Sequence, residues 1–150
     1  MKIYKQSDFK GKKWTYFQCF MAGHKYGETA EEYKAKEKQR LKETGVQPFY
    51  ETDEKIELFK IYRINGKDYI PGMTSDDIAI VKELDGGFSS DPNPRYGEST
   101  PHCPYCGEEY SDCYEDEEDC ECGNCGGIFN VLTELSYDTE PVRAPEVAEI

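Results

Sequence analysis

The sequence has no long apolar run. No stretch approaches the roughly 20 apolar residues of a membrane-spanning helix, and the first residues, Met1-Lys2-Ile3-Tyr4-Lys5, lack the apolar region of a signal peptide. We therefore expect no contact with a membrane and a cytoplasmic location. Hydrophobic residues make up only 37% of the 150 residues, so the core must be small and must depend on the 12 Tyr, 7 Phe and one Trp.

The sequence also lacks the recognised motifs of enzymes. It holds two histidines, His24 and His102, and neither adjoins a nucleophile motif. A Gly-rich phosphate loop, G-x-S-x-G and H-E-x-x-H are all absent. We therefore expect the protein not to be an enzyme. The alternative is a catalytic site built from carboxylates of the N-terminal domain, because scattered carboxylates carry no sequence signature.

Lysine and arginine are missing from one long stretch, between Tyr96 and Val142. Residues 1–42 hold 11 Lys/Arg and 5 Asp/Glu, a net charge of +6, and the remainder holds 7 and 26, a net charge of −19; together these give the net charge of −13. Such a split favours two surfaces with different partners. The simpler interpretation is that charge only keeps the protein soluble.

Cysteine is abundant and regularly spaced. The seven cysteines are Cys19, Cys103, Cys106, Cys113, Cys120, Cys122 and Cys125. An odd number would leave one unpaired in a secreted protein, whereas in a reducing cytosol we expect thiolate ligands with spares. Two Cys-x-x-Cys pairs, Cys103/Cys106 and Cys122/Cys125, are separated by fifteen residues, which is the ligand pattern of a four-thiolate zinc site.

Four cysteine ligands leave no open coordination position for water or substrate. We therefore predict that Cys103, Cys106, Cys122 and Cys125 hold a structural Zn²⁺. Iron of the rubredoxin type is the alternative, because the same sulfurs bind either metal. A module this short buries little apolar surface, so the metal is expected to supply its folding free energy, on the order of 10 kcal/mol or more.

The motif Cys103-Pro-Tyr-Cys106-Gly107, followed by Cys122-Gly-Asn-Cys125-Gly126-Gly-Ile-Phe-Asn-Val131, resembles a zinc ribbon. The order of a Pro-Tyr turn, an acidic hairpin and a second cysteine turn is similar to that of small ribbon proteins of bacteria and their phages. By this resemblance, Phe129 and Val131 would lie on the closing strand of the ribbon. The resemblance ends there, because residues 1–100 resemble no family. It implies, for the whole chain, an accessory protein that blocks a host nucleic-acid-handling enzyme by charge mimicry.

Four further residues leave alternatives open. Cys120 could replace Cys122 as a ligand, although Cys122 repeats the spacing and the following glycine of the first pair. Cys113 and Cys120 could form a reversible disulfide, which a reducing compartment disfavours. We expect His102, beside Cys103, to be a bystander, and Cys19, far from the other cysteines, to be a buried core residue.

The segment between the two pairs holds nine acidic residues and no basic residue. Together with the net charge of −2 of a zinc ion with four thiolates, these acids repel phosphate, so nucleic acid is an unlikely partner of the ribbon. An acidic surface with Tyr105, Tyr110 and Tyr114 suits a protein partner with a basic surface. The alternative is nucleic-acid binding by residues 1–45. The basic residues that would carry it are Lys34, Lys38 and Lys42 on a predicted helix, with Lys10, Lys12 and Lys13.

The N-terminal part is predicted to contain a strand and a helix. Residues 13–21 are rich in aromatic and β-branched residues, which favours a strand. Thr29 is the expected N-cap of a helix over residues 30–43, with Glu32 completing a capping box and Gly45 as the stop signal.

A hairpin is predicted next. Residues 56–64 form one strand, Asn65-Gly66 a type I′ turn and residues 67–70 the returning strand, which Pro71-Gly72 ends. Residues 73–84 are predicted as a short helix, although their β-branched residues suit a strand almost as well.

These elements predict an α+β fold, with a small N-terminal antiparallel sheet, one or two helices and a C-terminal zinc ribbon. The predicted division is an α+β domain over residues 1–85, a linker over 86–100, a zinc ribbon over 101–135 and a disordered acidic tail over 136–150. The function that fits is a non-enzymatic binding protein whose acidic surface engages a basic protein.

Overall fold

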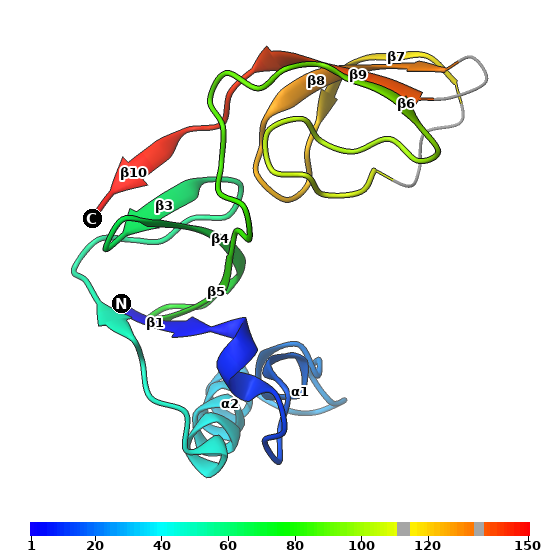
Figure 1. Ribbon diagram of the computed structural model, residues 1–150. Helices are drawn as coiled ribbons and strands as arrows, with labels where there is room; N and C mark the ends of the chain where they lie inside the picture. The colour runs from blue at the N-terminus through cyan, green and yellow to red at the C-terminus, as the bar shows by residue number, and fades with distance from the viewer. Residues whose placement is uncertain (111–114, 134–136) are drawn as a thin grey trace. The chain divides into compact units, whose positions relative to one another are not determined.

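The computed structural model describes residues 1–110, 115–133 and 137–150 (Figure 1). Over these residues the fold is mixed α+β, with two α-helices and two sheets, and most of the regular structure is strand. The chain forms two compact units. Unit 1 is Met1–Ile56 with Gly72–Lys82, and unit 2 is Glu57–Pro71 with Glu83–Ile150. Within the described ranges, the helices are too short and too polar to span a membrane.

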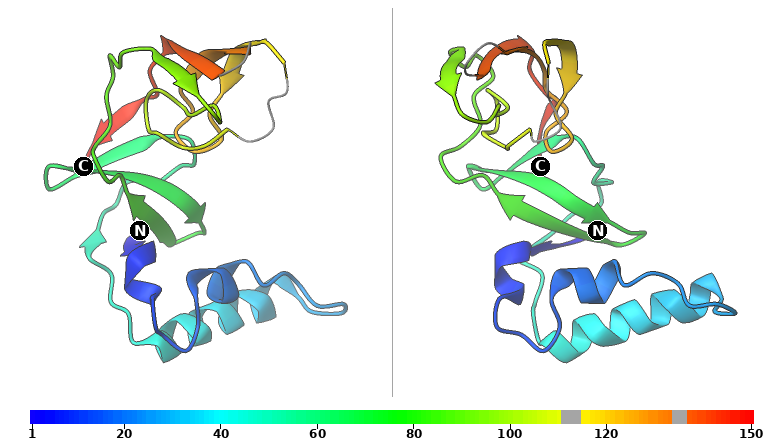
Figure 2. Two further views of the ribbon diagram at one scale, coloured as in Figure 1. Left: turned by 45° about the vertical axis from the view of Figure 1, so that its right-hand side comes forward. Right: turned by 90° about the vertical axis from the view of Figure 1, so that its right-hand side faces the viewer.

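Unit 1 combines a small set of strands with the helices. Strand β1 (Lys2–Lys5) pairs in parallel with β5 (Ile78–Glu83) and antiparallel with β2 (Tyr50–Glu51). A 3₁₀ turn, η1 (Gln6–Phe9), leads to α1 (Tyr16–Phe20) and α2 (Ala30–Thr44). The two helices lie beside each other on one side of β1 (Figure 2). The core between them includes Tyr4, Phe9, Cys19, Leu41 and Ile80.

Helix α2 confirms its prediction. The Thr29 hydroxyl accepts a hydrogen bond from the Glu32 amide, and the Glu32 carboxylate accepts one from the Thr29 amide, which closes the capping box. Gly45 follows the last turn with φ 70°, a left-handed conformation that glycine adopts without steric cost. Few side chains of α2 are buried, so the helix packs by a narrow stripe that includes Leu41.

The predicted strand over residues 13–21 is wrong, because this segment contains α1. The Thr15 hydroxyl accepts from the Gln18 amide, and the Gln18 side chain accepts from the Thr15 amide. This second capping box satisfies amides that a strand would leave to a neighbour. The helix buries Cys19 and Phe20 and leaves Phe17 54% exposed, a division of apolar residues that the aromatic composition alone did not reveal.

The predicted hairpin forms, with a shorter first strand and a longer second strand than predicted; its turn belongs to unit 2, and the last residues of the second strand belong to unit 1. Strand β3 (Ile61–Ile64) pairs antiparallel with β4 (Lys67–Thr74). Asn65 and Gly66 have φ 52° and 76°, as a type I′ turn requires. The first strand does not start at Ile56, because Phe59 has φ 62° and breaks the extended backbone. The second strand does not end at Pro71, which is buried within β4.

The predicted helix over residues 73–84 is also wrong. Residues from Ile78 to Val81 are all buried and form most of β5. A segment that is apolar on both faces suits a strand with a parallel neighbour, which β1 provides. A second parallel pair joins β3 to β10 (Val147–Glu149), so the pairing is mixed and not antiparallel as predicted.

The remaining strands of unit 2 form a four-stranded antiparallel sheet. Its order is β6-β9-β8-β7, from β6 (Arg95–Glu98), β9 (Tyr137–Arg143), β8 (Ile128–Thr133) and β7 (Glu117–Glu121). Strand β6 lies in the segment predicted as a linker, and β9 and β10 lie in the segment predicted as a disordered tail. Both predictions fail because polar segments gain order from the backbone hydrogen bonds of neighbouring strands, which composition does not record.

Candidate metal centre

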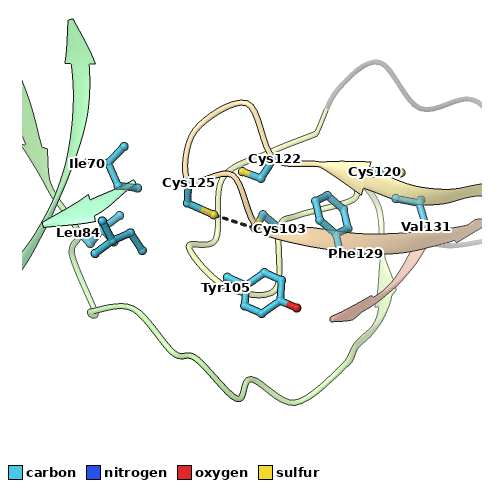
Figure 3. Packing of buried hydrophobic residues seen from close by; sticks show 10 residues of the cluster. Ile70, Leu84, Cys103, Tyr105, Cys120, Cys122, Cys125, Phe129 and Val131 are labelled. Atoms are coloured by element: carbon cyan, nitrogen blue, oxygen red, sulfur yellow. Dashed lines mark hydrogen bonds between the residues drawn. The ribbon is translucent and has the colours of Figure 1, made fainter. Parts of the chain in front are cut away.

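The structure brings the four predicted ligands together. The sulfurs of Cys103, Cys106, Cys122 and Cys125 all lie within 4.8 Å of one another. The sulfurs of Cys103 and Cys125 are 3.8 Å apart (Figure 3). Those of Cys106 and Cys122 are 3.7 Å apart. A tetrahedron with metal–sulfur bonds of about 2.3 Å has sulfur–sulfur edges of about 3.8 Å. The group could therefore hold a metal ion, and it is too open for a disulfide, in which the sulfurs are about 2.05 Å apart.

The two Cys-x-x-Cys turns, called knuckles below, have matching backbone geometry. In the first, the Gly107 amide donates to the Cys103 carbonyl at 2.9 Å; in the second, the Gly126 amide donates to the Cys122 carbonyl at 2.8 Å. Both glycines have φ 76°. A residue with a Cβ would be strained there, so the glycine that follows each pair in the sequence has a conformational role.

Polar groups also reach the sulfurs. The Gly127 amide donates to the Cys125 sulfur at 3.4 Å, and the Asn124 side-chain amide lies 3.8 Å from the Cys106 sulfur. The pKa of the Cys122 thiol is lowered, because the neighbouring thiols of Cys103, Cys106 and Cys125 hydrogen-bond to its sulfur. Such contacts orient thiolate ligands and stabilise their negative charge.

The knuckles are built into the core of unit 2. Phe129 and Val131, from β8, are fully buried beside the cysteines (Figure 3). The Tyr105 ring is buried and its hydroxyl donates to the Ile128 carbonyl at 3.1 Å. The same cluster includes three apolar residues from outside the ribbon segment, Ile61, Ile70 and Leu84. The cysteine module therefore shares a core with β3 and β4, which sequence spacing did not predict.

The residues named as alternatives lie elsewhere. Cys120 is buried on β7 and is not part of the group of four, which contains Cys122 as predicted. The Nδ1 of His102 faces the Glu98 carboxylate at 3.2 Å and the Thr100 carbonyl at 2.8 Å, and not the sulfurs. Cys19 is fully buried in unit 1. Cys113 lies outside the described residues, and with it the predicted disulfide.

The acidic segment forms a sheet edge. Strand β7 is the last strand of the order β6-β9-β8-β7, and its Glu117, Glu118, Asp119 and Glu121 are exposed while Cys120 points inward. Unit 2 holds 5 Lys/Arg and 20 Asp/Glu, a net charge of −15, whereas unit 1 holds 13 and 11, a net charge of +2. The acidity of the chain therefore belongs almost entirely to the unit with the cysteines.

The tyrosines predicted to lie on the acidic surface are not all exposed there. Tyr105 is buried, and Tyr110 is partly buried with its ring edge-on to Phe129, at 5.6 Å between ring centroids. Both rings serve the core beneath the cysteines. Tyr114 lies outside the described residues. Within the described residues, Tyr105 therefore adds no exposed ring to the acidic surface, and Tyr110 is only partly exposed.

The basic residues of α2 are largely engaged within unit 1. Lys34 forms an ion pair with Asp76, and Lys38 lies 3.5 Å from the carboxylate of Asp77. Lys42 is exposed near the end of the helix. The Asp76-Asp77 turn therefore neutralises much of the basic ridge on which the nucleic-acid hypothesis depended.

The same turn borders an open hollow in unit 1, of about 600 Å³. It is lined by Met1, Asp53, Lys55, Ile56, Thr74, Ser75, Asp76 and Asp77. Three of these residues, Asp53, Asp76 and Asp77, carry carboxylates, the groups that the alternative of a catalytic site requires. However, Asp76 and Asp77 are engaged with the lysines of α2.

Comparison of the chain with protein-family models, with curated proteins and with solved structures gives no match. The interpretation of unit 2 therefore depends on the spacing of its cysteines and on the geometry of their sulfurs. These support a metal-binding cysteine cluster, for which zinc is a plausible occupant.

Proposed function

We propose that this chain is a non-enzymatic binding protein, in which a structural zinc ribbon presents an acidic surface to a protein partner with a basic surface. The observation that carries the proposal is the juxtaposition, within unit 2, of a closed four-sulfur group with an exposed acidic edge strand, β7.

Zinc is the proposed metal because the donor set is four thiolates. Soft sulfur ligands in a tetrahedral arrangement suit Zn²⁺, and iron is the alternative for the same geometry. Four protein ligands leave no coordination position for a substrate, which supports a structural role. The role assigned to the metal is to fix the two knuckles, and hence the end of β7, which directly precedes Cys122.

The partner is proposed from charge. Within the described ranges, Glu117, Glu118 and Glu121 have no Lys or Arg in ion-pair contact. Unpaired carboxylates along an edge create a negative potential that accelerates association with a basic surface and favours it over an acidic one. Phosphate backbones are repelled by the same potential.

The resemblance to phage ribbon proteins narrows the proposal to an inhibitor that occupies the basic nucleic-acid channel of a host enzyme. The alternative, a nucleic-acid-binding accessory protein that uses residues 1–45, has less support, because Lys34 and Lys38 are ion-paired with Asp76 and Asp77. A gel-shift assay at low salt distinguishes them, since only the alternative predicts retention of nucleic acid by the full chain.

The test reverses the charge of the acidic edge. The variant Glu117→Lys/Glu118→Lys should retain its metal and lose capture of the partner from host lysate, with the remaining binding falling as salt rises. The matched control, Glu51→Lys/Glu54→Lys, makes the same change in net charge on unit 1 and should leave capture unchanged. If both variants captured the partner equally well, the acidic edge strand β7 would not be the binding surface.

A further inference from the structure

We propose that one backbone edge of β3 is a docking site for an extended acidic segment of another protein, and that β10 occupies this site as a replaceable strand of the same chain. The edge in question, called the β3 edge below, is the side of β3 that faces away from β4. Figure 1 shows β10 lying along it. The β3 edge lies within unit 2 and does not involve β7, so it goes beyond the function proposed above.

Backbone groups hold β10 on the β3 edge. Strand β10 is only three residues long and runs parallel to β3. At its two ends, the Ile61 amide donates to the Glu146 carbonyl at 3.0 Å, and the Ile150 amide donates to the Arg63 carbonyl at 3.4 Å. Backbone bonds to a strand edge do not depend on the identity of the side chains, so another extended segment can replace β10.

The side chains of β10 add little apolar burial. Val147 is 38% exposed, Ala148 is partly buried and Glu149 is exposed. Strand β3 differs, because Ile61 and Ile64 are fully buried and Ile61 belongs to the core cluster around the cysteines. A strand with few buried apolar contacts opens at a low free energy. Strand β10 is therefore the member of this pair that can detach while β3 stays ordered.

Charge determines which segment the β3 edge accepts. The Lys60 Nζ lies 2.9 Å from the Glu146 carboxylate, and the Arg63 guanidinium lies 3.7 Å from the Glu149 carboxylate. Both glutamate side chains are 77% exposed, so water and salt weaken these ion pairs and a competing segment can replace them. The site therefore fits an extended segment with two acidic residues three positions apart.

Carboxylates of the hairpin itself also contact the two basic residues. Lys60 pairs with Glu57 at 3.1 Å, and Arg63 pairs with Asp68 at 2.8 Å. Residues 57–71 nevertheless hold three of the five Lys/Arg of unit 2 and only two of its 20 Asp/Glu, a local net charge of +1 in a unit of −15. An acidic segment is matched to this edge, whereas a basic segment would lose both ion pairs that β10 makes.

The experiment adds a peptide of residues 144–150 to the full chain labelled with ¹⁵N, and amide chemical shifts measure binding. In the chain variant Ala148→Pro, the proline has no amide to donate, so the strand that competes for the β3 edge is weakened. This variant should bind the peptide about tenfold more tightly than the unmodified chain does, with shifts at Ile61–Ile64. A Glu146→Gln/Glu149→Gln peptide should bind to it about fivefold more weakly.

The matched control is Val147→Pro. The bonds made by Glu146 and Ile150 place the even-numbered residues of β10 toward β3, so the Val147 amide points away from it and its loss should change the affinity for the peptide much less. If Ala148→Pro does not fold, Glu146→Gln/Glu149→Gln in the chain weakens β10 without a proline. That variant should bind the unmodified peptide about fivefold more tightly than the unmodified chain does.

Four outcomes overturn the proposal. The first is an absence of saturable shifts at β3 in both weakened variants. The second is an equal gain in affinity in Val147→Pro, and the third is equal affinity for the glutamine peptide, which would remove the preference for acidic segments. The fourth is dimerisation of the unmodified chain that is lost in Ala148→Pro, which would assign the β3 edge to β10 of a second copy.

Discussion

Gly126 lies directly against the backbone carbonyl of Phe59. A Cβ placed on Gly126 would come within 2.6 Å of that oxygen, closer than two such atoms can approach. Phe59 itself has φ 62° and leaves its ring 51% exposed. The second knuckle is thus fitted to a strained turn that precedes β3, and the cysteine module is joined there to the remainder of unit 2.

This fit predicts different costs for the two knuckle glycines. Gly126→Ala combines the strain of a left-handed alanine, about 1–2 kcal/mol, with a backbone clash that adds about 1–3 kcal/mol. Gly107→Ala should cost only the strain, since its Cβ would meet nothing closer than an Arg95 nitrogen at 4.0 Å. Chemical denaturation of the metal-loaded variants measures both. Equal destabilisation would mean that the contact with Phe59 does not constrain the knuckle.

The two cysteines of the Cys-Glu-Cys sequence should respond differently to substitution. Cys122→Ser removes a sulfur from the group of four and should abolish stoichiometric metal binding and lower the stability of unit 2. Cys120→Ser should retain one metal ion per chain. Metal analysis and the Co²⁺ spectrum report both, and metal retention by Cys122→Ser with loss in Cys120→Ser would reverse the ligand assignment.

Thr139 offers a stabilising substitution. It is 0% exposed on β9, and within the described residues its hydroxyl has no hydrogen-bond partner. Burying an unpaired hydroxyl costs about 1–3 kcal/mol, so Thr139→Val, which replaces the hydroxyl with a methyl group, should raise the free energy of unfolding by about 1 kcal/mol.

The matched control is Thr133→Val on the neighbouring strand β8. The Thr133 hydroxyl donates to the Asp116 carboxylate at 2.8 Å and its amide donates at 2.6 Å, and these bonds lower the pKa of Asp116. Thr133→Val should therefore be destabilising. A loss of stability in Thr139→Val of the same size would show that its hydroxyl is satisfied in solution.

The buried thiol of Cys19 should make the folded protein less stable at alkaline pH. Burial raises the pKa of its thiol from 9.0 to about 11. Below pH 9 the thiol is protonated in both folded and unfolded chains, so it adds no pH dependence. Between pH 9 and 11 the unfolded chain loses this proton first, and stability should fall as pH rises. Cys19→Ala should show a smaller fall over this range in urea titrations, and identical slopes would contradict the raised pKa.

Sequence was sufficient where the determining interactions are local. The capping box of Thr29 and Glu32, the stop at Gly45 and the Asn65-Gly66 turn each depend on contacts within a few residues, and all three are confirmed. The spacing of the cysteines likewise identified the four sulfurs that the fold brings together.

Sequence was insufficient where a distant partner decides. Ile78–Val81 fits a helix or a strand, and the parallel pairing with β1 selects the strand. Residues 137–149 are polar and contain two prolines, and yet β8 and β3 order them by backbone pairing. Residues 13–21 have strand-like composition, but the Thr15–Gln18 capping box and the burial of Cys19 select a helix.

The sequence by itself therefore determined which four cysteines come together, the acidity of the segment between them and the local turns, because spacing, charge and capping are properties of neighbouring residues. Only the tertiary structure decided that the knuckles share a core with Ile61, Ile70 and Leu84, that Tyr105 and Tyr110 face inward, and that Lys34 and Lys38 are ion-paired. Each of these depends on contacts between segments far apart in the chain, and the free energy of such contacts cannot be derived from either segment alone.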